Sequence, residues 1–243
     1  MRIASLSARP APIDIDLDRA VLVVIDMQND FGSDGGMFQR AGIDIAPIRS
    51  IVPKIADVLQ DARAAGLPVL YTRQQHKADL SDAGSASAPH FIKHQRMQLG
   101  ATFPAPDGSI GRILVEDTWN TAIVPELAPH PGDIVVGKTR YSAFFDTALD
   151  DELKAIGAKY LIFTGATTSV CVESTVRDAM FRDYVCVVLD DCTAEPIAFD
   201  VPRSNHEASL LFIELLLGWV TAATDVQTVL RAHADRPAAL SPK

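Results

Sequence analysis

The 243-residue chain predicts a Rossmann-like α/β fold, a doubly wound and mostly parallel sheet with helices on both faces. Two observations support this. Short, continuous apolar segments, typical of strands buried on both faces, alternate with longer segments of helical periodicity. The length favours one domain, and a hydrophobic content of 48% is sufficient for a large core. We therefore expect a single domain over residues 1–243, with an N-terminal arm over residues 1–19.

Five apolar segments are predicted to form the strands of the sheet. They are Ala20–Ile25, Leu67–Thr72, Asp133–Val136, Tyr160–Thr164 and Tyr184–Leu189. The helical segments are Ile45–Ala65, Thr147–Ile156, Val170–Arg182 and Val201–Leu217. Gly66 and Gly157 stand where a glycine commonly ends a helix. A short last strand at Gly218–Ala222 and a helix from Asp225 complete the prediction, and the βαβ order indicates parallel strands.

Residues 74–118 do not fit this alternation of strands and helices. The segment is rich in Ala, Ser, Pro, Gly and His, and it is too long for an ordinary connection. Long loops in compact domains are usually functional or mobile. We expect a lid that carries substrate selectivity and has few anchors for independent packing. The alternative is a rigid excursion that makes a subunit interface.

The composition excludes several classes of function. The chain has 22 basic and 31 acidic residues, hence a net charge of −9, which argues against nucleic acid and anionic membranes as partners. Its three cysteines form neither a zinc-type pair nor a disulfide framework. The first residues lack the apolar core of a signal peptide, and Leu210–Val220 is too short to span a bilayer. A cytoplasmic enzyme acting on a small molecule is expected.

Three chemically reactive side chains follow predicted strands, at the edge where ligands bind in parallel α/β sheets. Asp26 follows the first strand, Lys138 follows Asp133–Val136, and Cys171 lies in the turn that leads into a predicted helix. A thiol near a helix N-terminus is favoured as a thiolate, which attacks carbonyl carbons. Asp26 is then the candidate base and Lys138 its charge partner. A structural ion pair beside a buried cysteine is the alternative.

The segments VLVVIDMQNDF, VVGKTRYSAFF and VVLDDCTA, in this order, closely resemble the isochorismatase-like cysteine hydrolases. The resemblance covers the chain from Ala20 to its C-terminal helix. It implies a catalytic Asp–Lys–Cys triad, a cis peptide before Thr167, and an oxyanion hole made by the N–H groups of Thr167 and Cys171. The residues expected to contact the substrate are Phe31, Arg73, His76, Thr168 and Tyr141.

The nicotinamidase branch of this family has a metal site after the second strand, with an Asp-x-His pattern and a second His three residues later. Here the corresponding residues are Gln74, His76 and Asp79. One imidazole and one carboxylate do not make a three-ligand site, so we predict no metal and no cofactor.

The resemblance implies a cysteine amidohydrolase that cleaves a C–N bond of a small ureide or amide through a thioester, releasing ammonia or a carbamate. The N-terminal segment and GDIVVGKTRYSAFF resemble ureidoacrylate amidohydrolase, whereas TRQQHKADLSD and GSIGRILVE are more similar to biuret hydrolase. Guanylurea, triuret, an N-carbamoyl amine and nicotinamide are alternative substrates. A non-catalytic module and an isochorismatase acting on an enol ether are alternative classes, and the intact triad argues against both.

A homo-oligomer, dimer or tetramer, is also expected. The segment Ser209–Val220 carries more apolar residues than one buried helix face needs. Members of the family assemble in this way, which supports the same expectation.

Overall fold

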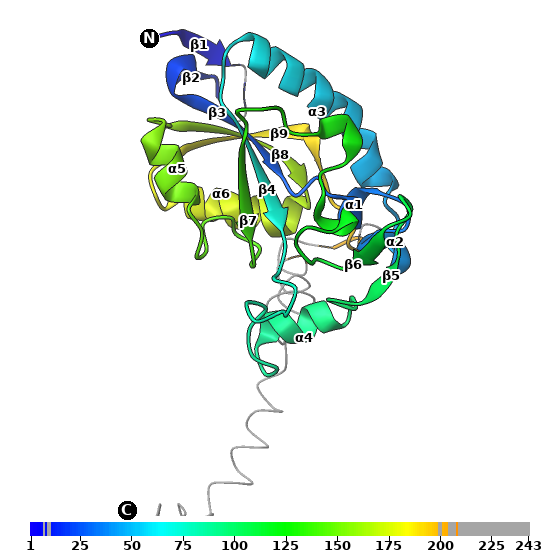
Figure 1. Cartoon of the computed structure of the whole chain (residues 1–243). Coiled ribbons are helices and arrows are strands. Elements are labelled where there is room, and N and C mark those ends of the chain that lie inside the picture. Colours follow the sequence, from blue (N-terminus) through cyan, green and yellow to red (C-terminus); the bar gives the residue numbers. More distant parts are fainter. Residues whose placement is uncertain (7, 9–10, 199–200, 204–207, 209–243) are drawn as a thin grey trace, which may run out of the picture. The chain divides into compact units, whose positions relative to one another are not determined.

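The computed structural model describes residues 1–6, 8, 11–198, 201–203 and 208 (Figure 1). Residues Met1–Val201 form one compact unit, to which the following description applies. Its main sheet has the strand order β7-β4-β3-β8-β9, and each neighbouring pair is parallel. The strands are β3 (Ala20–Ile25), β4 (Val69–Gln74), β7 (Ile134–Lys138), β8 (Tyr160–Ala166) and β9 (Val185–Ala194).

The order of the strands explains why helices cover both faces of the sheet. The chain moves in one direction from β3 to β4, and in the opposite direction from β7 to β8 and β9. Right-handed crossovers then place the connecting helices on opposite faces. In Figure 1, α3 (Ala46–Ala64) lies on one side of the sheet, and α5 (Leu149–Ala155) and α6 (Glu173–Met180) lie on the other. The predicted fold class is confirmed.

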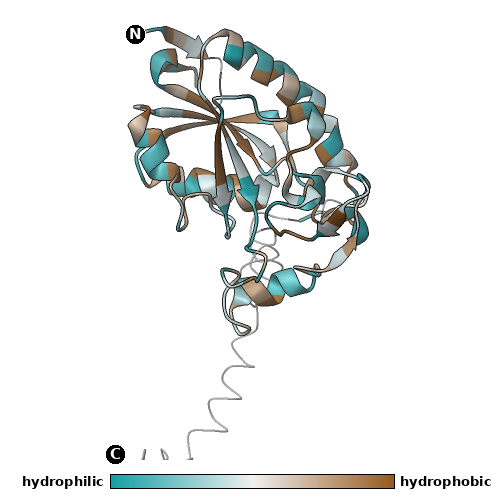
Figure 2. Cartoon of the chain, viewed as in Figure 1, coloured by the Kyte–Doolittle hydropathy of each residue, from teal (hydrophilic) through white to brown (hydrophobic). Residues whose placement is uncertain are grey.

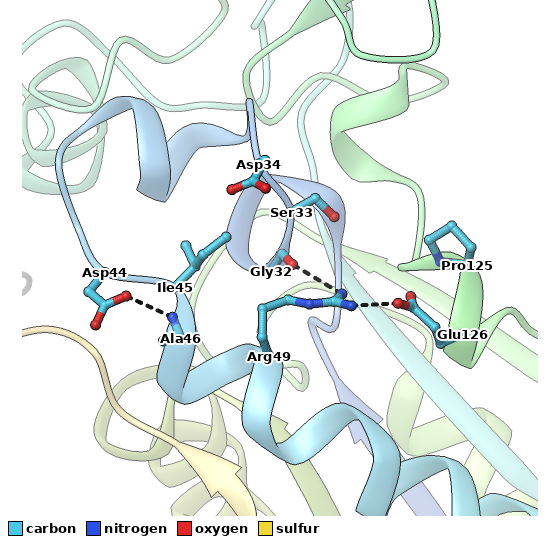
Figure 3. A pocket seen from close by; sticks show the side chains of 9 residues that line it. All are labelled: Gly32, Ser33, Asp34, Asp44, Ile45, Ala46, Arg49, Pro125 and Glu126. Atoms are coloured by element: carbon cyan, nitrogen blue, oxygen red, sulfur yellow. Dashed lines mark hydrogen bonds and ion pairs between the residues drawn. The ribbon is translucent and has the colours of Figure 1, made fainter.

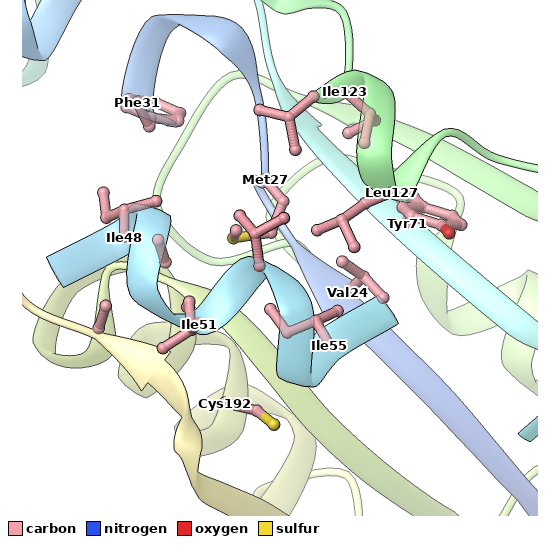
Figure 4. Packing of buried hydrophobic residues seen from close by; sticks show 14 of the residues in the cluster. Val24, Met27, Phe31, Ile48, Ile51, Ile55, Tyr71, Ile123, Leu127 and Cys192 are labelled. Carbon is pink, nitrogen blue, oxygen red and sulfur yellow. The ribbon is translucent and has the colours of Figure 1, made fainter. Parts of the chain in front are cut away.

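The core lies between α3 and the sheet. Strand β3 is buried along its whole length, as its continuous apolar sequence predicts. Helix α3 mixes polar and apolar residues along its length (Figure 2), and its apolar positions recur every three or four residues. Ile48, Ile51 and Ile55 thereby face Val24 and Met27 of the sheet side (Figure 4). Burying each such side chain contributes roughly 1.5–3 kcal/mol.

The two predicted helix-ending glycines are confirmed. Gly66 follows α3 with φ +73°, and Gly157 follows α5 with φ +67°. Residues with side chains rarely adopt these angles, so glycine ends both helices without strain.

Four strands end later than the apolar segments predict. β4 reaches Gln74 and β7 reaches Lys138, so both residues are strand residues and not loop residues. β8 reaches Ala166, and β9 reaches Ala194 after a register shift opposite Phe163–Gly165. The extra residues are partly polar. Some of these residues bond to distant parts of the chain, as Gln74 does to Lys138, and the spacing of apolar residues does not reveal such contacts.

The N-terminal arm is an antiparallel hairpin in the structure. β1 (Ile3–Leu6) pairs with β2 (Ile13–Asp16), and a 3₁₀ turn, η1 (Leu17–Arg19), leads into β3. The Arg2 side chain donates to the backbone oxygen of Ala65 at 2.7 Å, which ties the arm to the end of α3.

The long segment after β4 has structure of its own, so the expectation of few anchors is wrong. It contains helix α4 (Pro89–Gln95) and a hairpin of β5 (Thr102–Pro104) and β6 (Ile110–Arg112). Figure 1 shows α4 beyond the carboxyl end of β4. The turns η2 (Trp119–Thr121) and η3 (Pro125–Leu127) follow the segment.

Asp30 anchors this segment to the body of the molecule. It lies in the short helix α1 (Asn29–Gly32), which precedes α2 (Met37–Arg40), and its side chain is fully buried. The Asp30 carboxylate accepts hydrogen bonds from Leu114 N at 2.7 Å, Asn120 Nδ2 at 2.5 Å and Met37 N at 3.0 Å. Motion of the segment as a lid stays a prediction.

The predictions for the C-terminal part fall almost entirely outside the described residues. These are the helix Val201–Leu217, the strand Gly218–Ala222, the helix from Asp225 and the apolar segment expected to support assembly. Within the part that the structure describes, no helix is long and apolar enough to cross a membrane.

Candidate active site

Three strand ends bring Asp26, Lys138 and Cys171 into contact. Asp26 follows β3, Lys138 ends β7, and Cys171 lies in a π-helical turn, η4 (Thr168–Val172), between β8 and α6. The Lys138 ammonium lies 2.6 Å from Asp26 Oδ2 and donates to Cys171 Sγ at 3.4 Å. The side chains of the ion pair are both 0% exposed. The sequence thus predicted the three side chains that meet at this edge of the sheet.

The backbone at the ends of β3 and β8 explains this close approach. Asp26 has φ +49°, an angle that few residues other than glycine adopt and that is frequent at functional positions. Gly165 pairs with Ile25 and has φ +112°. A Cβ atom on Gly165 would lie 2.1 Å from the Ile25 carbonyl oxygen, so only glycine lets β8 pass here. The turn that carries Cys171 then begins directly beside Asp26.

The turn around Cys171 is held by several hydrogen bonds. The peptide between Ala166 and Thr167 is cis, as the family resemblance implied. Thr175 Oγ1 donates to the Cys171 carbonyl oxygen at 2.6 Å. The backbone N–H of Ser169 donates to the Glu195 carboxylate at 3.0 Å, and the Ser169 hydroxyl donates to the same oxygen. The contact between Ser169 and Glu195 bridges 26 residues, so local sequence patterns do not reveal it.

The electrostatics of the site differ from the expectation of a thiolate at a helix N-terminus. Burial raises the pKa of the Cys171 thiol well above its ordinary value; the Lys138 ammonium lowers it in part, and the Asp26 carboxylate raises it further. Burial alone would lower the pKa of Lys138, but Asp26 and Cys171 raise it above the ordinary value. The resting site therefore holds a neutral thiol beside a lysine–aspartate ion pair, because desolvation outweighs the attraction of the ammonium.

Strand β4 provides the polar groups that orient this ion pair. Thr72 Oγ1 donates to Asp26 Oδ1 at 2.7 Å, and Lys138 Nζ donates to Gln74 Oε1 at 2.9 Å. Successive side chains of a strand point to opposite faces, so Thr72 and Gln74 share the face toward the triad. Arg73, which we expected to contact the substrate, projects from the other face. The two-residue alternation in the sequence is the signal that distinguishes these residues.

A cluster of aromatic rings lies next to the triad. His90 and His94, four residues apart on α4, have ring centroids 4.0 Å apart, and the His76 ring lies 5.9 Å from His90. Tyr141 lies 5.4 Å from His90. Burial lowers the pKa of His90 to about 2 and that of His94 to about 4. Burial raises the pKa of Tyr141, and the proximity of Cys171 raises it further.

His76 and Tyr141 were predicted as substrate contacts, whereas no role was predicted for His90 and His94. Their i, i+4 spacing in PHFIKHQ places them on one face of a helix and is the signal that was available. Of the remaining predicted contacts, Thr168 begins η4 and is half-buried. Phe31 lies in the core, with its ring 4.9 Å from that of Phe38 (Figure 4).

The residues of the nicotinamidase-type pattern have other partners here. His76 Nδ1 lies 3.3 Å from Asp82 Oδ1, whereas the Asp79 carboxylate is exposed and accepts from Ser81 N. Among the residues that the structure describes, no three histidine, cysteine or acidic side chains are arranged to hold a metal ion. The absence of a metal stays a prediction.

A separate hollow of about 750 Å³ lies at the start of α3 (Figure 3). Three of its charged side chains, those of Asp44, Arg49 and Glu126, have partners within the protein. Arg49 bonds to Glu126 and to the Gly32 carbonyl oxygen, and Asp44 accepts from Ala46 N. No residue of the triad lines it, so it is not part of the site described above.

The doubly wound parallel sheet and the contact of Asp26, Lys138 and Cys171 at its carboxyl edge are the features that the resemblance to the isochorismatase-like cysteine hydrolases implied. The model of the Isochorismatase domain matches residues 20–225, and the chain belongs to this family. A ureidoacrylate amidohydrolase RutB from Methylobacterium radiotolerans is 38% identical over 96% of this chain and 88% of the relative. A protein of the same name from Methylorubrum extorquens is 38% identical over 96% of this chain and 91% of the relative.

Solved structures with the same fold include two enzymes. A cysteine hydrolase from Pseudomonas syringae pv. phaseolicola has a TM-score of 0.64 and 28% identity, covering 90% of this chain and 95% of that one. An N-carbamoylsarcosine amidase from Thermoplasma acidophilum has a TM-score of 0.56 and 25% identity, covering 81% of this chain and 92% of that one.

Proposed function

We propose that this protein is a cysteine amidohydrolase that cleaves a C–N bond of a small ureido compound through a thioester at Cys171. The observation that carries the proposal is the position of Lys138, whose ammonium contacts both the Asp26 carboxylate and the Cys171 sulfur. A structural ion pair has no need of a thiol at hydrogen-bond distance, whereas a nucleophile, a base and a charge partner need this arrangement.

Because the resting thiol is neutral, Cys171 must lose a proton during attack, and Asp26 and Lys138 each have a role in that step. As the sulfur bonds to the substrate carbonyl carbon, the thiol proton passes to Asp26, and Lys138 holds the carboxylate and the developing thiolate in place. The N–H groups of Thr167 and Cys171 are the proposed donors to the oxyanion. When the C–N bond breaks, the leaving nitrogen takes the proton from Asp26. Water then attacks the thioester with Asp26 again as base, which releases the acid product and restores the thiol.

Ureidoacrylate is the first substrate to test, because relatives that carry this activity in their names align over nearly the whole chain. The N-carbamoylsarcosine amidase among the structural neighbours also acts, by its name, on a carbamoylated amine. Both relationships support a carbamoyl group as the part of the substrate that meets the thiol.

The test is product release from ureidoacrylate and a panel of N-carbamoyl compounds, with Cys171→Ala as the inactive variant. Cys186→Ala is the matched control, since Cys186 is a half-buried thiol on β9. The proposal predicts turnover by the parent and by Cys186→Ala, and none by Cys171→Ala. Turnover by Cys171→Ala at the parent rate, or none by the parent on any member of the panel, contradicts it.

A further inference from the structure

Glu195 connects the end of a fourth strand to the turn that carries Cys171. It follows β9, whose last residue pairs with the last residue of β8, so these two strands end side by side. One oxygen of the Glu195 carboxylate accepts from the backbone N–H of Ser169 at 3.0 Å and from the Ser169 hydroxyl. The other oxygen accepts from the backbone N–H of Ile197 at 2.9 Å. The carboxylate thereby holds a residue that lies two positions before the thiol.

This contact replaces a cap that the turn does not provide for itself. The first N–H groups of a helical turn lack an acceptor within the helix, and the residue before the turn commonly supplies one through its side chain. In η4 that residue is Thr167, whose side chain makes no such hydrogen bond. The Thr167 carbonyl oxygen accepts from the N–H groups of Val170 and Val172 at 3.1 and 3.2 Å. The N–H of Ser169 instead receives its acceptor from Glu195, at the end of another strand.

The position of Ser169 matters because it lies between the two proposed oxyanion donors. The N–H groups of Thr167 and Cys171 flank it along the chain, so their directions depend on the backbone of residues 167–171. Donors of this kind lower the barrier only if they already point to the place where negative charge develops. The Glu195 carboxylate also occupies the N–H of Ser169, which leaves the oxygen of the substrate to the other two groups.

We propose that Glu195 is a positioning residue that holds residues 167–171 in the conformation that directs both N–H groups to the oxyanion. This role rests on the proposed function and assigns it a residue outside the triad. Glu195 acts through the backbone of the turn and not on the reacting atoms. The alternative is a cap that contributes only to the stability of the fold. The two roles differ in their effects, because the oxyanion exists during the reaction and not in the resting protein.

Two substitutions separate the reach of the side chain from its charge. Glu195→Asp keeps the carboxylate but draws it back from Ser169 by one methylene group. Glu195→Gln keeps the length and one acceptor oxygen but removes the charge. With ureidoacrylate as substrate, kcat should fall about 100-fold in Glu195→Asp and KM should change less than about threefold, because misplaced donors affect the transition state. Glu195→Gln should retain kcat within about fivefold, since Ser169 N–H keeps its acceptor.

A matched variant and a second reaction serve as controls. Glu173→Ala removes a carboxylate on the adjacent helix α6 that pairs with Arg177, and it should leave kcat unchanged. Alkylation of Cys171 by iodoacetamide is a displacement at a saturated carbon and generates no oxyanion. Its rate in Glu195→Asp should therefore stay within about twofold of the parent rate, since the thiol and its charge partners are intact. Thermal unfolding of each variant shows whether it is folded at the assay temperature.

Protection of Cys171 by acetaldehyde reports on the oxyanion donors without turnover. The sulfur bonds to the aldehyde carbon and the thiol proton passes to the aldehyde oxygen, which gives a hemithioacetal with no leaving group. The oxygen of this adduct takes the place of the oxyanion. The acetaldehyde concentration that halves the rate of alkylation should be about tenfold higher in Glu195→Asp than in the parent or in Glu173→Ala.

The outcomes distinguish the role of Glu195 from the proposed function. If the parent turns over no ureidoacrylate but the tenfold difference in protection holds, the proposed function fails and the role of Glu195 stands. A Glu195→Asp variant with the kcat and the protection of the parent overturns the inference, and so does one that does not fold, which would assign Glu195 to the fold alone. Equal losses of kcat in Glu195→Asp and Glu195→Gln, alkylation that slows in proportion to kcat, or a parent that acetaldehyde does not protect also overturn it.

Discussion

Replacing Asp26 by Asn separates the two effects that this carboxylate has on the thiol. In the parent, Asp26 raises the pKa of Cys171, and Lys138 lowers it. The substitution removes the negative charge, preserves the shape of the side chain, and leaves the carbonyl oxygen to accept from Thr72. The thiol should become more acidic, whereas turnover should fall because the proton acceptor is lost.

The distances in the structure give the magnitude of both effects. At 3.4 Å, with an effective dielectric constant of about 20, an ammonium and a thiolate attract by about 5 kcal/mol. In the parent, the Lys138 ammonium also pairs with the Asp26 carboxylate, 2.6 Å away. In the variant, the ammonium has no carboxylate partner and its charge acts on the sulfur alone. Loss of a general base lowers turnover by roughly 10²–10⁴-fold. The variant should thus react faster with an alkylating agent at neutral pH and hydrolyse substrate far more slowly.

The assay is alkylation by iodoacetamide as a function of pH, with the modified cysteine identified by peptide mapping. The midpoint of Cys171 alkylation should lie at lower pH in Asp26→Asn than in the parent. Cys186, whose pKa burial raises to about 11, is an internal reference and should not change. An alkylation midpoint at higher pH in the variant, or turnover at the parent level, would refute the assignment of Asp26 as base.

Two further predictions follow from the surroundings of the site. Dialysis against a strong chelator should leave the rate unchanged, because His76 is bonded to Asp82; activity that is lost and then restored by zinc, iron or manganese would contradict this. Asp30→Ala should lower the free energy of unfolding in urea by about 3 kcal/mol or more, since three buried N–H donors lose their acceptor. A loss below about 1 kcal/mol would show that Asp30 does not anchor the long segment. Burial raises the pKa of Asp30 to about 6, so the folded protein holds this proton more tightly than the unfolded chain. The free energy of unfolding of the parent should therefore fall as the pH rises from about 4 to 6. The Asp30→Ala variant should lack this fall.

The sheet and the triad were predictable because both depend on local sequence. The strand Ala20–Ile25 has a continuous apolar sequence, and the structure reproduces its bounds. Asp26, Lys138 and Cys171 each stand at or near the end of such a strand, and topology alone brings strand ends together. The family resemblance added the cis peptide before Thr167, which neither periodicity nor spacing indicates.

The remaining features depend on contacts between distant parts of the chain. Gln74 was read as a lost metal ligand, because its bond to Lys138 spans 64 residues. The raised pKa of Cys171 results from its burial, which no single segment determines. The long segment was expected to be poorly anchored from its composition, yet the buried carboxylate of Asp30 accepts from Leu114 within the segment and from Asn120 just after it, 84 and 90 positions away.

The most direct test of the central claim is the mass of the intact protein after rapid quenching with a ureide substrate. A thioester adds the mass of the transferred carbamoyl or acyl group to the parent, and peptide mapping should locate it on Cys171. The adduct should be absent in Cys171→Ser and should persist longer in Asp26→Asn, because the base that activates the hydrolytic water is missing. Turnover by a parent protein that shows no adduct at any quench time, or an adduct on another residue, would contradict the claim.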